Sequence, residues 1–158
     1  GFYNVFIDSE TLDVLMGMEL LNELYFEKSQ ICGSIEEVFK LSELQQFGME
    51  NCVAGFNPAN LPQNSGLNFL NLNYTELRNT ENRNYHSLDE LELLPLAENT
   101  AIFERFPKLR YLYIAGQGME DATFVSSLSR IQEIDLRDNN ITDLSPLDDL
   151  RYLSNVIK

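Results

Sequence analysis

The chain is poor in the residue types on which many small functional sites depend. Its 158 residues include one histidine, two cysteines and no tryptophan. The single histidine, His86, excludes a multi-histidine metal site, and we expect a surface or packing role for it. The cysteines, Cys32 and Cys52, are too few for a disulfide-rich scaffold, although their number does not exclude an oxidising compartment.

Positive charge and long apolar runs are also scarce. The 11 Lys and Arg residues stand against 25 Asp and Glu, which gives a formal net charge of −14. Such a chain repels phosphate backbones and anionic membranes, so we expect no nucleic-acid partner and favour a basic or neutral one. The same charge also promotes solubility. No apolar run approaches the roughly 18 residues of a membrane span, so we expect no direct membrane insertion.

Signatures of catalysis and cofactor binding are missing as well. The sequence has no GxxxxGK[ST] phosphate loop, no GxGxxG, no GxSxG and no paired CxxC. The acidic stretch from Asp135 to Asp143 resembles a calcium loop, but the required glycine and glutamate positions fall on Asn140 and Pro146. We therefore predict a protein that is not an enzyme and that uses no cofactor or metal.

What the sequence does contain is an apolar pattern that repeats. Its last third follows the template LxxLxLxxNxIxxLxxLxxL, and Leu128, Ile131 and Ile134 recur 22 residues later as Leu150, Leu153 and Val156. Degenerate copies of LxxLxL precede it at 109–114, 88–93, 67–72, 44–49 and 21–26, and Val5 and Ile7 open a first copy. A period of this size predicts a solenoid whose repeats bury their apolar faces against one another.

This pattern resembles bacterial leucine-rich-repeat proteins of the internalin-like type, and the resemblance covers the whole chain. It implies one domain over residues 1–158, with seven repeats and a partial eighth. The implied fold is a right-handed α/β solenoid with a parallel sheet of about eight short strands on its concave face. The convex face would consist of 3₁₀ or short helical turns and loops. We expect the ends to be uncapped or truncated, since the chain starts at Gly1 and Val156 begins an unfinished strand.

The position after each strand normally holds an asparagine that bonds neighbouring backbones inside the solenoid. Here this column reads Glu10, Ser29, Cys52, Thr75, Leu96, Gln117 and Asn139. Cys52 is predicted to be a buried structural thiol, and the register is least secure at Glu10 and Leu96. Residues 55–66 and 78–85 are predicted to be convex loops, and residues 31–35 resemble a second extended segment.

Alternation along each strand assigns the residues that face outward on the concave sheet. We predict that Tyr111 and Tyr113 anchor a binding surface, because tyrosine is favoured in interfaces, and that acids flank them. The full predicted set is Tyr25, Phe69, Asn71, Glu90, Glu92, Tyr111, Tyr113, Glu133, Asp135 and Arg137. Acids around aromatic rings favour a basic peptide or protein surface. The alternative is that the tyrosines only shield one another or the sheet.

Three functions are compatible with this pattern. The resemblance implies a non-enzymatic module that binds a protein partner, and it implies a secreted or cell-surface location in a bacterium. A second reading is a spacer or self-assembling segment of a larger cell-surface protein, in which the strand at Val156 pairs with another chain. A third is carbohydrate binding, since tyrosines and carboxylates also stack on sugars and form hydrogen bonds with them.

Overall fold

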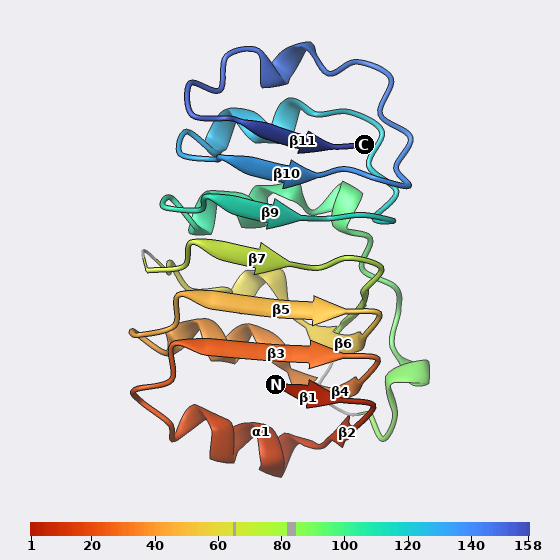
Figure 1. Ribbon diagram of the computed structural model, residues 1–158. Coiled ribbons are helices and arrows are strands. Elements are labelled where there is room, and N and C mark those ends of the chain that lie inside the picture. The colour runs from red at the N-terminus through yellow and green to blue at the C-terminus, as the bar shows by residue number, and fades with distance from the viewer. Residues whose placement is uncertain (65, 82–84) are drawn as a thin grey trace.

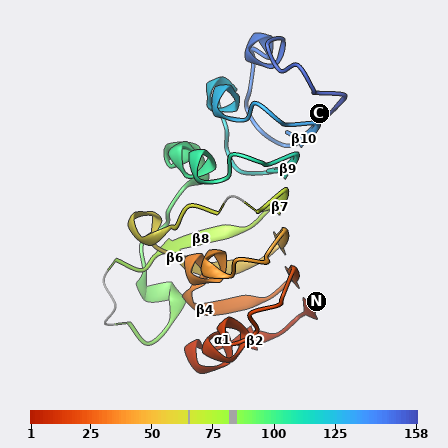
Figure 2. The ribbon, with the colours of Figure 1, turned by 90° about the vertical axis from the view of Figure 1, so that its left-hand side faces the viewer.

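The computed structural model describes residues 1–64, 66–81 and 85–158. Its main feature is a parallel sheet of seven short strands in the order β1-β3-β5-β7-β9-β10-β11 (Figure 1). These strands are Phe2–Tyr3 (β1), Glu23–Glu27 (β3), Gln46–Glu50 (β5), Phe69–Asn71 (β7), Tyr111–Tyr113 (β9), Glu133–Asp135 (β10) and Asn155–Ile157 (β11). Seen from the side, the sheet curves so that its free face is concave (Figure 2). The predicted leucine-rich-repeat architecture is confirmed.

The connections on the other side of the sheet are short and mostly helical. An α-helix, Ser9–Met16 (α1), begins at Ser9 because the Asp8 carboxylate accepts a 2.8 Å hydrogen bond from the backbone N–H of Thr11. The 3₁₀ helices are Ile35–Lys40, Pro58–Asn60, Leu88–Glu90, Leu96–Glu98, Thr100–Arg105, Thr123–Ser127 and Ser145–Leu147. Helical turns of this kind suit apolar residues spaced three apart, as in the last repeats.

The core lies between the sheet and these turns. In β9, Leu112 is fully buried while its neighbours Tyr111 and Tyr113 are only partly buried. The equivalent inward residues of the adjacent strands, Leu70 and Ile134, are buried as well. Each such side chain contributes roughly 1.5–3 kcal/mol to folding. The predicted alternation of inward and outward residues is therefore correct along these strands.

A second parallel sheet lies on the flank of the first four turns. Its strands are Phe6–Ile7 (β2), Gln30–Ser34 (β4), Val53–Phe56 (β6) and Glu76–Asn79 (β8), in that order across the sheet. The expectation of a second extended segment at residues 31–35 is thus confirmed. The loops predicted at 55–66 and 78–85 begin later than expected, because their first residues complete β6 and β8. Within those loops, residues 65 and 82–84 lie outside the described residues.

The first strand of the main sheet is not the one that the pattern predicted. Phe2 and Tyr3 pair with Phe26 and Glu27 of β3, whereas the segment around Val5 and Ile7 leads into the second sheet. Phe2 takes the inward position because its ring stacks on that of Phe26, with centroids 5.2 Å apart. The first strand of the main sheet therefore lies a few residues earlier in the sequence than predicted.

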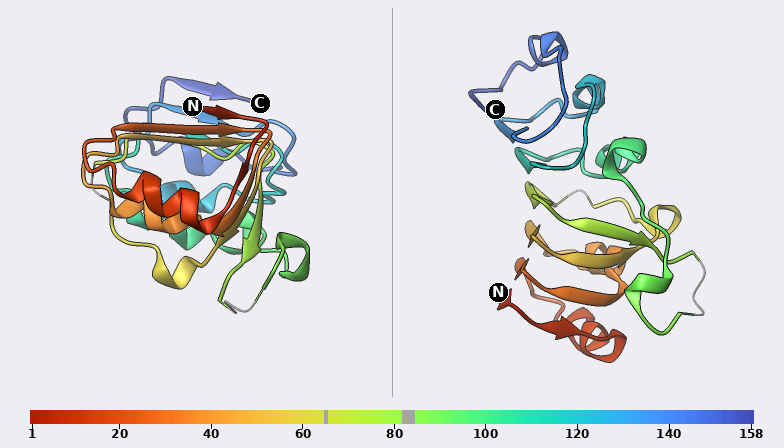
Figure 3. Two further views of the ribbon diagram at one scale, coloured as in Figure 1. Left: turned by 90° about the horizontal axis from the view of Figure 1, so that it is seen from below. Right: turned by 90° about the vertical axis from the view of Figure 1, so that its right-hand side faces the viewer.

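The strand predicted at Leu91 to Leu93 is also absent from the main sheet. β7 pairs directly with β9, with Phe69 opposite Tyr111 and Asn71 opposite Tyr113. Residues 92–94 run antiparallel to β8 instead, held by hydrogen bonds from Asn79 N to Glu92 O (2.9 Å) and from Leu94 N to Leu77 O (2.8 Å). The segment between β8 and β9 therefore leaves the stack, at the lower right of Figure 1 and in both views of Figure 3.

A polar column stabilises the turns that follow the strands, as predicted. The backbone N–H of Ser29 donates to Cys52 Sγ (3.5 Å), and that of Cys52 donates to Thr75 Oγ1 (3.4 Å). Further along, the backbone N–H of Gln117 donates to Asn139 Oδ1 (3.1 Å). Burial raises the pKa of the Cys52 thiol, so this residue is a structural member of the column. The two residues that departed from the template, Glu10 and Leu96, lie in helices outside it.

Candidate binding surface

Four aromatic side chains gather on the concave face of the main sheet. Phe69 of β7 lies at their centre, with ring centroids 5.9 Å from Tyr25, 6.5 Å from Tyr111 and 5.3 Å from Tyr113. All four are partly buried, so each leaves part of its ring accessible to a partner. We call these four residues the aromatic cluster. It forms because β7 and β9 are neighbours, which brings Phe69 beside both tyrosines of β9.

Tyr25 reaches the aromatic cluster by crossing a neighbouring strand. It belongs to β3, and Gly48 of β5 lies between it and β7. A Cβ atom on Gly48 would lie 2.7 Å from Cδ1 of Tyr25, which is closer than a carbon contact allows. The absence of a side chain at Gly48 therefore lets the Tyr25 ring lie over β5 and meet Phe69.

The hydroxyl groups of Tyr25 and Tyr111 each donate a hydrogen bond to a glutamine of the neighbouring turn. Tyr25 donates to Gln46 Oε1 (2.5 Å), and Tyr111 donates to Gln132 Oε1 (3.3 Å). Gln46 in turn donates from Nε2 to Glu23 Oε1 (3.1 Å). Burial, followed by the charge of Glu23, raises the pKa of Tyr25 above its ordinary value. Both rings are thus fixed in orientation before any partner binds.

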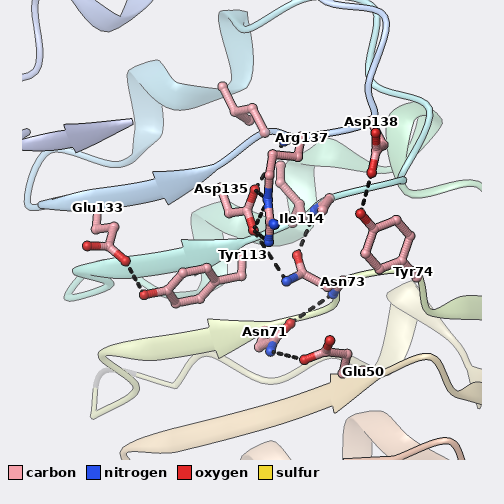
Figure 4. Close-up of polar contacts among 12 residues, drawn as sticks. Glu50, Asn71, Asn73, Tyr74, Tyr113, Ile114, Glu133, Asp135, Arg137 and Asp138 are labelled. Carbon is pink, nitrogen blue, oxygen red and sulfur yellow. Dashed lines mark hydrogen bonds and ion pairs between the residues drawn. The ribbon is translucent and has the colours of Figure 1, made fainter. Parts of the chain in front are cut away.

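Tyr113 is held by a carboxylate. Its hydroxyl donates to Glu133 Oε1 (Figure 4). Asn155 also donates to this carboxylate, from Nδ2 to Glu133 Oε2 (2.8 Å). Burial and the hydrogen bond to Glu133 raise the pKa of Tyr113, so the phenol stays protonated at neutral pH. The hydrogen bonds from Asn155 and Tyr113 lower the pKa of Glu133, which remains a carboxylate.

Asp135 faces the concave side but is completely buried. The Arg137 guanidinium covers it, with Nη2 2.7 Å from Oδ2 and Nε 3.0 Å from Oδ1, and Asn73 donates from Nδ2 to Oδ2 (3.4 Å). Burial alone would raise the pKa of Asp135, but the hydrogen bonds and charge of Arg137 hold it below the ordinary value. Asp135 is therefore a structural anion, and the Arg137 side chain, 49% exposed, is the part of this ion pair that reaches the surface.

Asn71 continues this polar network toward β5. Its side chain donates from Nδ2 to Glu50 Oε2 (3.4 Å), and its Oδ1 accepts from the backbone N–H of Asn73 (2.9 Å). Asn73 Oδ1 also accepts from the backbone N–H of Ala115 (2.7 Å). The network in Figure 4 thus links β5, β7, β9 and β10 on the concave side.

Most of the predicted set lies together, and two members do not. Phe69, Asn71, Tyr111, Tyr113, Glu133 and Asp135 are on the adjacent strands β7, β9 and β10, Tyr25 is on β3 beyond β5, and Arg137 is two residues past the end of β10. The prediction for Glu90 and Glu92 is wrong, because both belong to the segment that leaves the stack between β8 and β9. Gly48, Gln46 and Glu50 were not selected, although the alternation along β5 places them on the same face.

Other kinds of site find no support in the described residues. Within the described ranges, no group of three or more His, Cys, Asp or Glu side chains is arranged to hold a metal ion. His86 is exposed, and its backbone N–H donates to Glu90 Oε2 (3.2 Å). No helix in the described part of the chain has the length and hydropathy to span a membrane.

Comparison with known proteins identifies the fold but no narrower class. No protein-family model matches the sequence, and no curated protein does. An internalin of Listeria monocytogenes, InlF, has a similar structure, with a TM-score of 0.60 and 18% sequence identity over 92% of this chain and 43% of that protein. A second Listeria monocytogenes internalin, InlC2, has a TM-score of 0.48 and 16% identity over 95% of this chain and 75% of that protein. The chain spans less than half the length of InlF, and over nearly all of its own length it has an internalin-like leucine-rich-repeat fold.

Proposed function

We propose that this chain is a non-enzymatic recognition module that binds a protein or peptide through its concave face. The aromatic cluster is the observation that supports this proposal most directly. Four aromatic side chains on a solvent-facing surface are unfavourable unless something covers them, and aromatic residues dominate the energetics of protein interfaces. Leucine-rich-repeat folds of the internalin type typically serve protein interactions, which agrees with this assignment.

The aromatic cluster is organised in advance for binding. The hydroxyls of Tyr25, Tyr111 and Tyr113 are each bonded to a neighbouring side chain, so little rotational freedom remains to be lost. A rigid surface binds more tightly than a mobile one of the same area, because ordering a side chain costs about 0.5–1.5 kcal/mol. The rings and not the hydroxyls are therefore the groups that a partner contacts.

The charges around the aromatic cluster favour a basic partner. Glu133 accepts a hydrogen bond from Tyr113, and Glu23 accepts one from Gln46, which itself bonds to Tyr25. Glu50 lies on β5, next to the strand of Phe69. A Lys or Arg side chain placed over an aromatic face gains roughly 0.5–2 kcal/mol from the ring quadrupole, and nearby carboxylates add to this attraction. A peptide in which a basic residue adjoins an apolar one would use both features.

The other two functions have weaker support. A sugar needs polar groups that are free to form hydrogen bonds, whereas the tyrosine hydroxyls of the aromatic cluster already have partners. Self-assembly through β11, which pairs only with β10 among the described residues, is tested by the molar mass in solution. A monomer at high concentration would contradict it. A secreted or cell-surface location remains part of the proposal, on the basis of the fold similarity.

Selection of peptides from a random display library tests the proposed function. We expect the immobilised protein to enrich sequences that pair Arg or Lys with an aromatic or aliphatic residue. Phe69→Ala should weaken the binding of these peptides at least about tenfold, which corresponds to about 1.4 kcal/mol. Phe6→Ala is the matched control, because Phe6 is 65% exposed and belongs to β2 of the second sheet, outside the aromatic cluster. Equal binding to wild type and Phe69→Ala would refute the concave site.

A further inference from the structure

A surface of the opposite charge lies at the N-terminal ends of β9 and β10, the left-hand side of the sheet in Figure 1. Lys108 and Arg110 flank the buried Leu109, so alternation along the chain directs both side chains outward. Arg130 precedes β10 by the same distance as Lys108 precedes β9. The repeat therefore stacks basic residues from two successive turns beside one another.

The backbone hydrogen bonds define this stacking. Arg110 N donates to Asn68 O (2.9 Å), and Gln132 N donates to Arg110 O (2.7 Å), which places these three residues in one column across the sheet. Lys108 and Arg130 lie two residues earlier in the same turns. Together these side chains line an open hollow of about 520 Å³, to which Gly66 and Tyr152 also contribute. We call it the basic hollow.

The three cations of the basic hollow have no counterions within the described residues. The ion pairs found there involve Lys28, Lys40, Arg78 and Arg137 only. Like charges on neighbouring strands repel each other, so this arrangement costs stability. In a chain with 25 acidic side chains, nothing in the fold itself accounts for three cations that are stacked without an acid between them.

We propose that the basic hollow binds a carboxylate-bearing, acidic segment of a protein partner. Arginine guanidinium groups bind carboxylates in a bidentate manner, and the side chains of Asn68 and Gln132 can bond to a peptide backbone. The backbone N–H groups of Arg110 and Gln132 already donate within the sheet, so only side chains are free to bind an anion here, and no backbone cradle for a phosphate is formed by these two residues.

The basic hollow adjoins the concave face without depending on it. Gln132 lines the basic hollow and also accepts the hydrogen bond from the Tyr111 hydroxyl. One protein partner would thus meet a basic surface at the start of the strands and an acidic, aromatic surface further along. The proposal does not require the aromatic cluster to bind anything, because the two surfaces can be altered by separate substitutions.

Titration with N-acetyl tetraglutamate amide, followed by NMR of the arginine Nε–Hε groups, tests this proposal. At about 0.1 M salt, long-range repulsion is screened over roughly 10 Å. We expect saturable shifts of the Arg110 and Arg130 resonances. We also expect backbone shifts around the basic hollow to disappear in the double variant Arg110→Gln with Arg130→Gln.

The control is the double variant Arg105→Gln with Lys158→Gln, which changes the net charge equally at exposed sites away from the basic hollow. It should bind the peptide as wild type does. The proposal is overturned if wild type shows no saturable shift up to about 10 mM peptide, or if both double variants lose binding alike. Shifts with tripolyphosphate but not with the peptide would also overturn it, since they would assign the hollow to phosphate.

Discussion

The side-chain amide of Gln117 donates to the carbonyl oxygen of Thr75 at 3.0 Å, although 42 residues separate them. The same amide donates to the carbonyl oxygen of Leu72 at 2.7 Å. These bonds join the turn after β9 to the turn after β7, at the point where the chain leaves the stack between β8 and β9. Gln117 thus bonds directly to the turn after β7, and so continues the polar column past the segment between β8 and β9, which contributes no residue to it.

Replacing Gln117 by leucine should destabilise the protein by about 1–3 kcal/mol, because two carbonyl oxygens would lose their side-chain donor. The measurement is the free energy of unfolding from urea titration. Gln63→Leu is the matched control: Gln63 is exposed, and its replacement should change stability by less than about 0.5 kcal/mol. Equal stability of both variants would show that the column does not depend on Gln117.

Serine substitutions at Leu91 and Leu93 distinguish the observed chain path from the predicted one. If residues 91–93 formed a strand of the main sheet, both leucines would point into the core and both substitutions would be costly. Leu91 is buried here, whereas Leu93 is 58% exposed. We therefore expect Leu91→Ser to cost about 2–4 kcal/mol and Leu93→Ser less than about 1 kcal/mol in urea titrations. Comparable losses at both positions would contradict this path.

The repeat pattern predicted the core and the outward-facing residues correctly in those repeats where the apolar spacing and the polar residue of the turn both fit the template. From Leu109 to Val156 the inward residues and the Asn139 position follow one register, and the structure has the same register. At Leu91 and Leu93 the apolar spacing matches the repeat, but this segment pairs with β8 of the second sheet and is not part of the main sheet. Periodicity predicted the burial of Leu88 and Leu91 correctly, but it also assigned Leu93 to the core, whereas this side chain is 58% exposed. The signal that distinguished this segment was Leu96, which brings no polar group to the column.

The binding surface was only partly predictable for a similar reason. Alternation placed Tyr25, Tyr111 and Tyr113 on one face correctly. It could not show that Arg137 covers Asp135, because that contact depends on side-chain conformation. Nor could it show that Gly48 makes room for a ring from the next strand. Such pairwise relationships arise from three-dimensional contact between repeats, which a one-dimensional pattern does not contain.

Gly48→Ala tests whether the aromatic cluster depends on that close approach. The new Cβ would displace the Tyr25 ring from Phe69, so we expect tyrosine-to-phenylalanine nuclear Overhauser contacts between them to vanish. The cost in stability should be about 1–3 kcal/mol, typical of overpacking. A second substitution, Tyr25→Ala, removes the clashing ring, and in that background Gly48→Ala should cost less than about 0.5 kcal/mol. An equal cost in both backgrounds would place the strain elsewhere.

Glu36 predicts a dependence of stability on pH. It is fully buried in the 3₁₀ helix Ile35–Lys40; its Oε2 accepts from Asn57 N (3.0 Å), and its Oε1 has no partner within the described residues. Burial raises the pKa of Glu36, and the hydrogen bond from Asn57 offsets this only in part. The folded state therefore holds the proton more tightly than the unfolded chain does. The stabilisation is complete below the unfolded pKa of about 4.3 and is lost as pH rises through the folded pKa.

Glu36→Gln should consequently raise the free energy of unfolding at about pH 8, by roughly 1–3 kcal/mol, because the variant buries no charge. At about pH 4 the wild-type carboxyl is already protonated, so the difference between the two proteins should approach zero. Urea titrations at both pH values measure this difference. Glu37→Gln is the neighbouring control, since Glu37 is only partly buried and pairs with Lys40, and it should show no comparable gain at high pH. A gain for Glu36→Gln of equal size at both pH values would mean that the amide packs better, and would exclude a buried charge as the cause.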